Sequence, residues 1–341
     1  MARAVSLFKS LGVINPNEAD YLSLLGQSTC RQVLDALSDI VFNGYRQYIV
    51  HSFFNPYVLI LLIAPLPLRI VLLPHGELKQ DALRISADKK RIVLHLLRPF
   101  KSLNERLRKI TMIASNSEEL LVAKDFLGAS RCHLLFDLVS REMPYGDGKN
   151  RNSTTGLNLI NIARMVPNKG MARFLAEVRR SLQQANHKWI HQIDAIHFFY
   201  TSEDACELQR VQSLAFELAS KYQIRIVLYG DLRPSEIAQM LTTLPNRMAF
   251  LSSKFESFSY ALIESLGFEY KTMVWFNNEL VENLAALDLC VPIKFGEIPS
   301  DQMMDEHHML SNFTHAAQFL INAEEQSIHD YRQLLQNSLH G

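Results

Sequence analysis

The sequence is poor in the residues that mark several large protein classes. Only 4 of its 341 residues are cysteine, and it contains no Gly-Gly pair. Cys30, Cys132, Cys206 and Cys290 are too scattered for a zinc site or for the disulfide framework of a small secreted domain. We therefore expect buried, reduced thiols.

Long uninterrupted apolar runs are also missing. The most apolar stretch, residues 57–73, contains Pro65, Pro67 and Arg69. It therefore predicts a helix followed by a buried strand, and not a membrane span. Near the first residue, Arg3 and Lys9 are not followed by the apolar core of a signal peptide. We expect a cytoplasmic protein.

Net charge is zero over the whole chain but not over its parts. Residues 1–150 contain 19 Lys and Arg against 14 Asp and Glu, a net charge of +5, and the rest contains 16 against 21, a net charge of −5. So small an excess does not indicate nucleic acid, and no zinc-finger, RNP or basic-zipper pattern is present. We expect no nucleic-acid partner.

Much of the positive charge lies in residues 84–109, where Lys and Arg are interleaved with Ile, Val, Leu and Phe. Such a segment fits an anionic membrane surface, which would make the protein peripheral on the inner face of the plasma membrane. It fits equally well a core-packed helix with a solvated basic face. The sequence leaves both interpretations open.

The chain is long enough and, at 48% apolar residues, hydrophobic enough for two domains. Strand-like runs alternate with helical segments on both sides of a polar, turn-rich linker at residues 143–153, which predicts parallel sheets. We predict a first domain over 1–147, a second over 154–322 and a final helical segment over 323–341. The predicted strands are 48–50, 69–73, 110–114, 157–163, 195–200, 225–228, 248–251 and 271–276.

Two glutamates stand around a predicted strand-to-helix turn. The strand 248–251 is followed by a polar turn and by a helix through about residue 267. Ligand crevices of open α/β sheets form at the carboxyl ends of strands, where Glu256 and Glu264 can accept hydrogen bonds from sugar and ribose hydroxyls. Backbone N–H groups suited to a phosphate are those of Ser257, Phe258 and Ser259. By itself the pattern also fits a capped helix with two solvated glutamates.

A second strand-to-helix connection carries two cations. The strand 157–163 leads into a loop and then into a helix over 171–184. Arg164 and Lys169 flank the loop, where a planar fork and a point charge can clamp a diphosphate. Taken alone, the segment is better explained as two solvated basic residues.

Three segments occur in the order and approximate spacing of a known donor-site pattern. They are Ile162-Ala-Arg-x4-Lys-Gly170, Val227-Leu-Tyr-Gly230 and Ser253-x2-Glu256-Ser-Phe-x5-Glu264-Ser-Leu-Gly267. Together they resemble the retaining glycosyltransferases of the GT-B fold, in the group of many bacterial exopolysaccharide and lipopolysaccharide enzymes. Similar first-domain segments are Tyr48–Ser52, Leu73–Leu78 and Ala114–Glu119. The resemblance spans roughly residues 45–295 and depends on the joint order, because each motif alone is weak.

The resemblance implies an α/β protein with two Rossmann-like domains facing a cleft, the first of them shortened. It implies that Arg164 and Lys169 bind the donor diphosphate, together with Ser257, Phe258 and Ser259. It also implies that Glu256 contacts the transferred sugar and Glu264 the ribose. His75 would face the donor sugar from the first domain, although without the resemblance it is better explained as an ordinary loop histidine.

The activity implied by the resemblance is transfer of a sugar, with retention, from a nucleotide-diphosphate sugar to a glycan or lipid-linked acceptor in cell-surface polysaccharide synthesis. No Asp-x-Asp pair stands at a predicted strand end, so we expect no metal and no cofactor. A lipid-linked acceptor favours the membrane interpretation of residues 84–109. Two alternatives share the fold: a non-catalytic GT-B scaffold or nucleotide-binding partner subunit, and a nucleotide-sugar epimerase.

Overall fold

The chain divides into two compact units in this computed structural model. One comprises Met1–Leu138 with Glu324–Gly341, and the other comprises Val139–Ala323. The structure describes residues 47–51, 53–54, 69–84, 90, 94, 110–127, 131–135, 156–184, 188–256, 259–304, 309 and 311–340. The predicted linker 143–153, most of the basic segment 84–109, Ser257 and Phe258 lie outside these residues.

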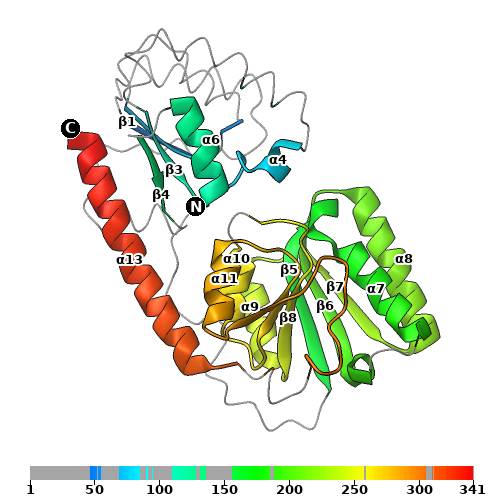
Figure 1. Cartoon of the computed structure of the whole chain (residues 1–341). Coiled ribbons are helices and arrows are strands. Elements are labelled where there is room, and N and C mark those ends of the chain that lie inside the picture. Colours follow the sequence, from blue (N-terminus) through cyan, green and yellow to red (C-terminus); the bar gives the residue numbers. More distant parts are fainter. Residues whose placement is uncertain are drawn as a thin grey trace. The chain divides into compact units, whose positions relative to one another are not determined.

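The first unit contains a four-stranded parallel sheet in the order β1-β2-β3-β4 (Figure 1). Its strands are β1 (Gln47–His51), β2 (Arg69–Leu73), β3 (Ile110–Ala114) and β4 (Cys132–Leu134), and its described helices include α4 (Gln80–Arg84) and α6 (Ser117–Leu127). Side chains 70–73 of β2 are all buried, as expected for a parallel strand that is covered on both faces. The predictions for β2 and β3 are confirmed to the residue.

The second unit contains a six-stranded sheet in the order β10-β9-β8-β5-β6-β7, and every pairing in it is parallel. Its strands are β5 (Leu157–Met165), β6 (Ile193–Ser202), β7 (Arg225–Gly230), β8 (Arg247–Leu251), β9 (Thr272–Val274) and β10 (Cys290–Pro292). Its helices are α7 (Met171–Gln184), α8 (Ala205–Tyr222), α9 (Pro234–Thr243), α10 (Tyr260–Ser265) and α11 (Glu279–Ala286), with short 3₁₀ turns η4 (Pro167–Lys169) and η5 (Lys188–Gln192).

Alternation along these strands divides the core into two layers. Leu159, Phe198 and Phe250 join α7 and α8 in one buried cluster. Their chain neighbours Ile160 and Phe199 pack in a second cluster with residues of α9. Figure 1 shows α7 and α8 on one face of the sheet and α9, α10 and α11 on the other. The period of two therefore buries both faces, which makes the strands almost continuously apolar.

The strand order changes direction at β5, and this feature places the site. The chain proceeds from β5 outward to β6 and β7, and then returns to the other side of β5 with β8, β9 and β10. Parallel sheets with this order form a crevice beside the carboxyl ends of the two strands at the switch. A ligand site is therefore expected where β5 and β8 end.

Three predictions from the sequence need correction. β5 continues to Met165, two residues past the predicted end, and is paired with β6 as far as Ser202, so Arg164 flanks the loop from within the strand. The last helix, α13, is Phe313–His340 and begins ten residues before the predicted 323, because Asn312 accepts a hydrogen bond from the backbone of His315 at 3.1 Å. Cys206 is exposed, not buried.

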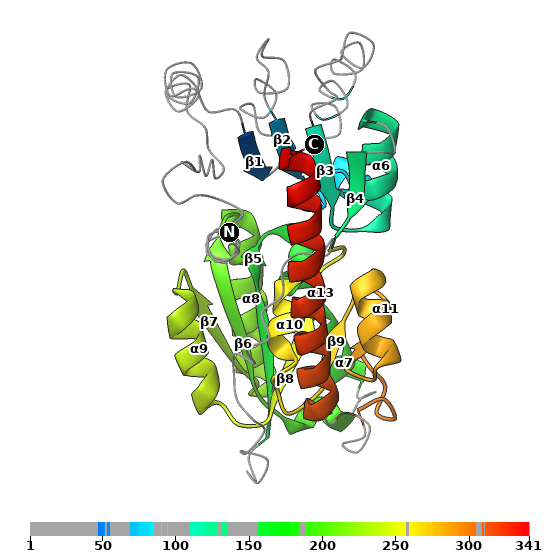
Figure 2. The same ribbon diagram turned by 90° about the vertical axis from the view of Figure 1, so that its left-hand side faces the viewer.

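The turned view in Figure 2 shows α13 as a single continuous helix. No helix among the described residues is both long and apolar enough to cross a membrane.

Candidate functional site

A cavity of about 310 Å³ lies where β5, β6 and β8 end, at the position that the strand order predicts. Its walls come from segments that are far apart in the sequence. The residues that line it are Asn161, Ile162, Ala163, Arg164, Lys169, Phe199, Tyr200, Thr201, Leu232, Ile237, Leu251, Ser253, Glu256, Ser259, Tyr260, Ala261 and Glu264. Of the eight site residues predicted from the sequence, five meet here: Arg164, Lys169, Glu256, Ser259 and Glu264.

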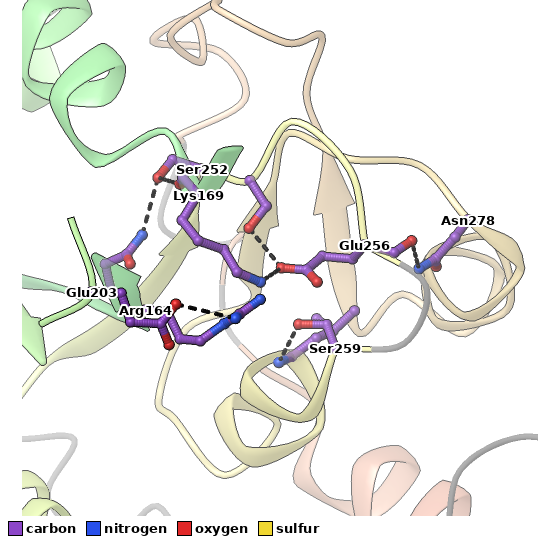
Figure 3. Close-up of polar contacts among 10 residues, drawn as sticks. Arg164, Lys169, Glu203, Ser252, Glu256, Ser259 and Asn278 are labelled. Carbon is purple, nitrogen blue, oxygen red and sulfur yellow. Dashed lines mark hydrogen bonds and ion pairs between the residues drawn. The ribbon is translucent and has the colours of Figure 1, made fainter. Parts of the chain in front are cut away.

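Lys169 and Glu256 form the polar centre of this pocket. The Lys169 ammonium contacts Glu256 Oε1 in an ion pair, and the two side chains are 13% and 15% exposed (Figure 3). The hydroxyl of Ser253 donates to the same oxygen at 2.7 Å. Asn278 donates to the backbone carbonyl of Glu256 at 3.3 Å, which holds the loop. The carboxylate is therefore oriented by neighbours on two sides.

Arg164 is the more exposed of the two cations. Its Nη1 lies 3.2 Å from Glu203 Oε2, and the side chains are 60% and 38% exposed. Surface ion pairs of this kind contribute little to stability, so an incoming phosphate can displace the glutamate at small cost. Each cation of the pocket is thus held by a carboxylate: Arg164 by Glu203 and Lys169 by Glu256 (Figure 3).

Ser259 and Glu264 belong to the short helix that follows. Ser259 is the N-cap of α10, and its hydroxyl accepts from the backbone of Leu262 at 3.3 Å. That helix begins at Tyr260, and Glu264 lines the pocket from its last turn.

An apolar wall completes the cavity and was not found from the sequence. It is formed by Tyr200, Leu232, Ile237 and Tyr260, which come from the end of β6, the connection after β7, α9 and α10. Such a combination of an apolar wall and a few charged groups is typical of small-molecule sites. No motif could reveal it, because single apolar residues in different segments carry no signal of their own.

The loop that carries Lys169 is fastened tightly to the turn after β8. Gly170 ends η4 with φ of 68°, and a Cβ atom at this position would lie 2.1 Å from the carbonyl oxygen of Ser252. The backbone of Lys254 donates to the carbonyl of Asn168 at 2.7 Å. Only glycine allows both the left-handed conformation and this close approach.

His75 lies in the first unit, in the turn after β2. Its side chain is exposed and its φ is 51°, and Gly76 follows with φ of 82°. The buried carboxylate of Glu119 accepts from the backbone of Leu78 at 3.3 Å and from the backbone of Ser115 at 2.9 Å, which ties this turn to α6. Burial raises the pKa of Glu119 above its ordinary value, although these donors oppose the shift.

The described residues contain no group of three or more His, Cys, Asp and Glu that could hold a metal ion. The polar groups of the pocket are two cations, two predicted ligand-binding carboxylates, the side-chain amide of Asn161 and several hydroxyls. Such a set can bind phosphate through the cations and sugar hydroxyls through the carboxylates.

No family model matches the sequence, and no curated protein matches it either. Several solved structures, in contrast, are similar to this chain. A sucrose-phosphate synthase from Thermosynechococcus elongatus has a TM-score of 0.68 at 12% identity, over 90% of this chain and 77% of its own. A UDP-forming trehalose-phosphate synthase from Burkholderia xenovorans has a TM-score of 0.65 at 10% identity, over 91% and 76%. The chain has the GT-B fold.

A third solved structure, a glycosyltransferase from Rickettsia africae, is similar over 98% of this chain and 87% of its own, with a TM-score of 0.61 at 11% identity. Identities this low show the fold alone. The activity of this chain depends on the chemistry of its pocket, because one fold can serve many functions.

Proposed function

We propose that the protein is a glycosyltransferase that uses a nucleotide-diphosphate sugar as donor. The observation that carries the proposal is the cavity at the strand switch, which brings Arg164, Lys169, Glu256 and Glu264 together from segments about a hundred residues apart. This is the place where open parallel sheets bind nucleotides.

The donor diphosphate is assigned to Arg164 and Lys169. In the described structure these cations are neutralised by Glu203 and Glu256, and phosphate oxygens would take the place of those carboxylates. When the bond between the sugar and the diphosphate breaks, negative charge grows on the departing phosphate. Two cations already in place stabilise that charge without a metal ion. Ser257, Phe258 and Ser259 are assigned to the same phosphates through their backbone.

The two glutamates are assigned different hydroxyl groups. Glu256, released from Lys169 when the diphosphate binds, accepts hydrogen bonds from the transferred sugar, and Glu264 accepts from the ribose. The apolar wall with Tyr200 and Ile237 is suited to the flat base. His75 is assigned to the donor sugar from the first domain.

Retention of configuration, a glycan or lipid-linked acceptor and a role in cell-surface polysaccharide synthesis rest on the family resemblance. Neighbours with the fold are named for sugar-phosphate products, such as trehalose phosphate and sucrose phosphate. Contact with an anionic membrane through 84–109 belongs to the same proposal, because a lipid-linked acceptor lies at a membrane surface.

Calorimetric titration with UDP, GDP and ADP, with a chelator present, tests the donor site. We expect micromolar binding of one nucleotide, weakened tenfold to a hundredfold in Lys169→Ala because a hydrogen-bonded charge is lost. We also expect Glu264→Ala to weaken it. The matched control is Lys221→Ala, which removes an exposed lysine of α8 that pairs with Glu217. Absence of binding by the wild type to all three nucleotides would contradict the proposal.

Incubation with donor sugars alone separates the activities that share the fold. A transferase leaves the sugar of its donor unchanged until an acceptor is added, whereas an epimerase converts it without one. A scaffold would bind the nucleotide and do neither. Cells that carry Glu256→Ala or Lys169→Ala would then still make the biological product that depends on this protein.

A further inference from the structure

A chain of hydrogen bonds leads from the interior of the sheet to the predicted phosphate-binding lysine. Asn161 of β5 donates from Nδ2 to the carbonyl of Phe250 at 2.5 Å and to the hydroxyl of Ser252 at 3.2 Å. The Ser252 hydroxyl in turn donates to the backbone carbonyl of Lys169 at 2.8 Å (Figure 3). Asn161 is 2% exposed and Ser252 is 1% exposed.

The chemistry of these groups determines which one donates in each of the three hydrogen bonds. The carbonyls of Phe250 and Lys169 can only accept hydrogen bonds. Asn161 must therefore present its amide NH₂ to Phe250, and Ser252 must spend its single proton on Lys169. The hydroxyl of Ser252 is then left to accept from Asn161. Reversing any one of these bonds would place two acceptors face to face.

The side chain of Asn161 contains one buried oxygen, Oδ1, that is left without a donor among the described residues. An unsatisfied buried acceptor is unfavourable, so the side chain of Asn161 carries a cost in its oxygen that its two donated hydrogen bonds offset only in part. Asn158, three residues earlier on the same strand, differs: its Nδ2 donates to the carbonyl of Pro245 and its Oδ1 faces His197. The contrast indicates that Asn161 serves something other than the core.

We propose that Asn161 and Ser252 are positioning residues that act through Lys169. The link holds the Lys169 carbonyl against the turn after β8, and the close approach of Gly170 to Ser252 limits its freedom on the other side. Without the Ser252 hydroxyl, the backbone that carries the ammonium group loses the side-chain hydrogen bond to the Lys169 carbonyl. The inference rests on the proposed donor site and deepens it.

The test is a double-mutant cycle on nucleotide affinity. Dissociation constants for UDP, GDP and ADP are measured for the wild type, Ser252→Ala, Lys169→Ala and the double variant. We expect Ser252→Ala to weaken the best-bound nucleotide about tenfold in the wild-type background. In the Lys169→Ala background the same substitution should change the affinity by less than about twofold, because there is no ammonium group left to position.

The matched control is Ser265→Ala, which removes another buried serine hydroxyl, one that donates to Leu262 within α10 and does not line the pocket. It should leave the affinity within about twofold of the wild type. Asn161→Ala is the second variant, and we expect a loss of about threefold that also disappears in the Lys169→Ala background. Circular dichroism verifies that each variant is folded.

Three results would overturn the inference. Ser252→Ala could bind as tightly as the wild type, or it could weaken binding equally in both backgrounds, which would show a general distortion of the pocket. If the wild type binds none of the three nucleotides, the donor site itself fails and the inference fails with it. The wild-type titration alone separates that case from the other two.

Discussion

Acid should destabilise the second unit through one buried histidine. His197 lies in the middle of β6, 2% exposed, with its ring stacked on Tyr229 at a centroid distance of 6.0 Å. Its Nε2 lies 3.1 Å from Asn158 Oδ1, which makes Nε2 the protonated nitrogen. Nδ1 is buried and has no partner among the described residues. A proton added there would create a buried charge with no acceptor.

The size of this loss in the free energy of unfolding follows from the lowered pKa of His197. Burial, assisted by the positive charge of Arg225, lowers the pKa of His197 from 6.5 to about 4. The unfolded chain therefore takes up a proton more readily than the folded one between these values. The stability that depends on the neutral ring is complete above pH 6.5 and is lost as the pH falls toward 4. From pH 7.5 to pH 4.5 the loss amounts to about 2 to 3 kcal/mol.

Urea unfolding followed by tryptophan fluorescence measures this loss. Both tryptophans, Trp189 and Trp275, are buried in the second unit, so the signal reports on that unit. Carboxylates also titrate over this range, and the comparison variant His197→Gln subtracts their effect. The wild type should lose about 2 to 3 kcal/mol more than the variant between the two pH values. Equal losses in both proteins would refute the reasoning.

Two further predictions concern the same unit and use the same assay. Arg247→Met leaves the buried carboxylate of Glu269, now 2.7 Å from the arginine, without its counter-charge, and should cost about 3 to 5 kcal/mol. The control Arg225→Met removes an exposed ion pair and should cost less than about 1 kcal/mol, and similar costs for the two would contradict the argument. Gly170→Ala places a Cβ atom in a left-handed backbone conformation and against Ser252, so it should lower the free energy of unfolding by at least about 2 kcal/mol. An unchanged unfolding midpoint would contradict this, because it would mean that the loop adjusts without strain.

Local patterns in the sequence were sufficient for much of the fold. The apolar runs at 69–73 and 110–114 and the helix over 171–184 are found at the predicted residues. In each of these segments the apolar period and the flanking polar residues agree with the tertiary environment. The start of the last helix was predicted wrongly. It was placed at residue 323, ten residues late, although Asn312 is a good N-cap for a helix that begins at Phe313.

The sequence alone also assembled the charged part of the candidate site. Arg164, Lys169, Glu256, Ser259 and Glu264 were chosen from their order along the chain, and all five line one pocket. This was possible because strand ends of a parallel sheet share one edge, so residues that follow different strands are brought together by the architecture itself. Their assigned roles stay predictions until nucleotide binding is measured.

Only the tertiary structure decided how those side chains are held. Glu203 on Arg164 and Ser252 on Lys169 act across 39 and 83 residues, and no local period records a contact of that separation. The strand order decides it: β8 returns to lie beside β5, and this pairing places the Ser252 turn against the Lys169 loop. A sequence pattern states which side chains are available, whereas hydrogen bonds depend on distances of a few ångströms that exist only after the sheet has formed.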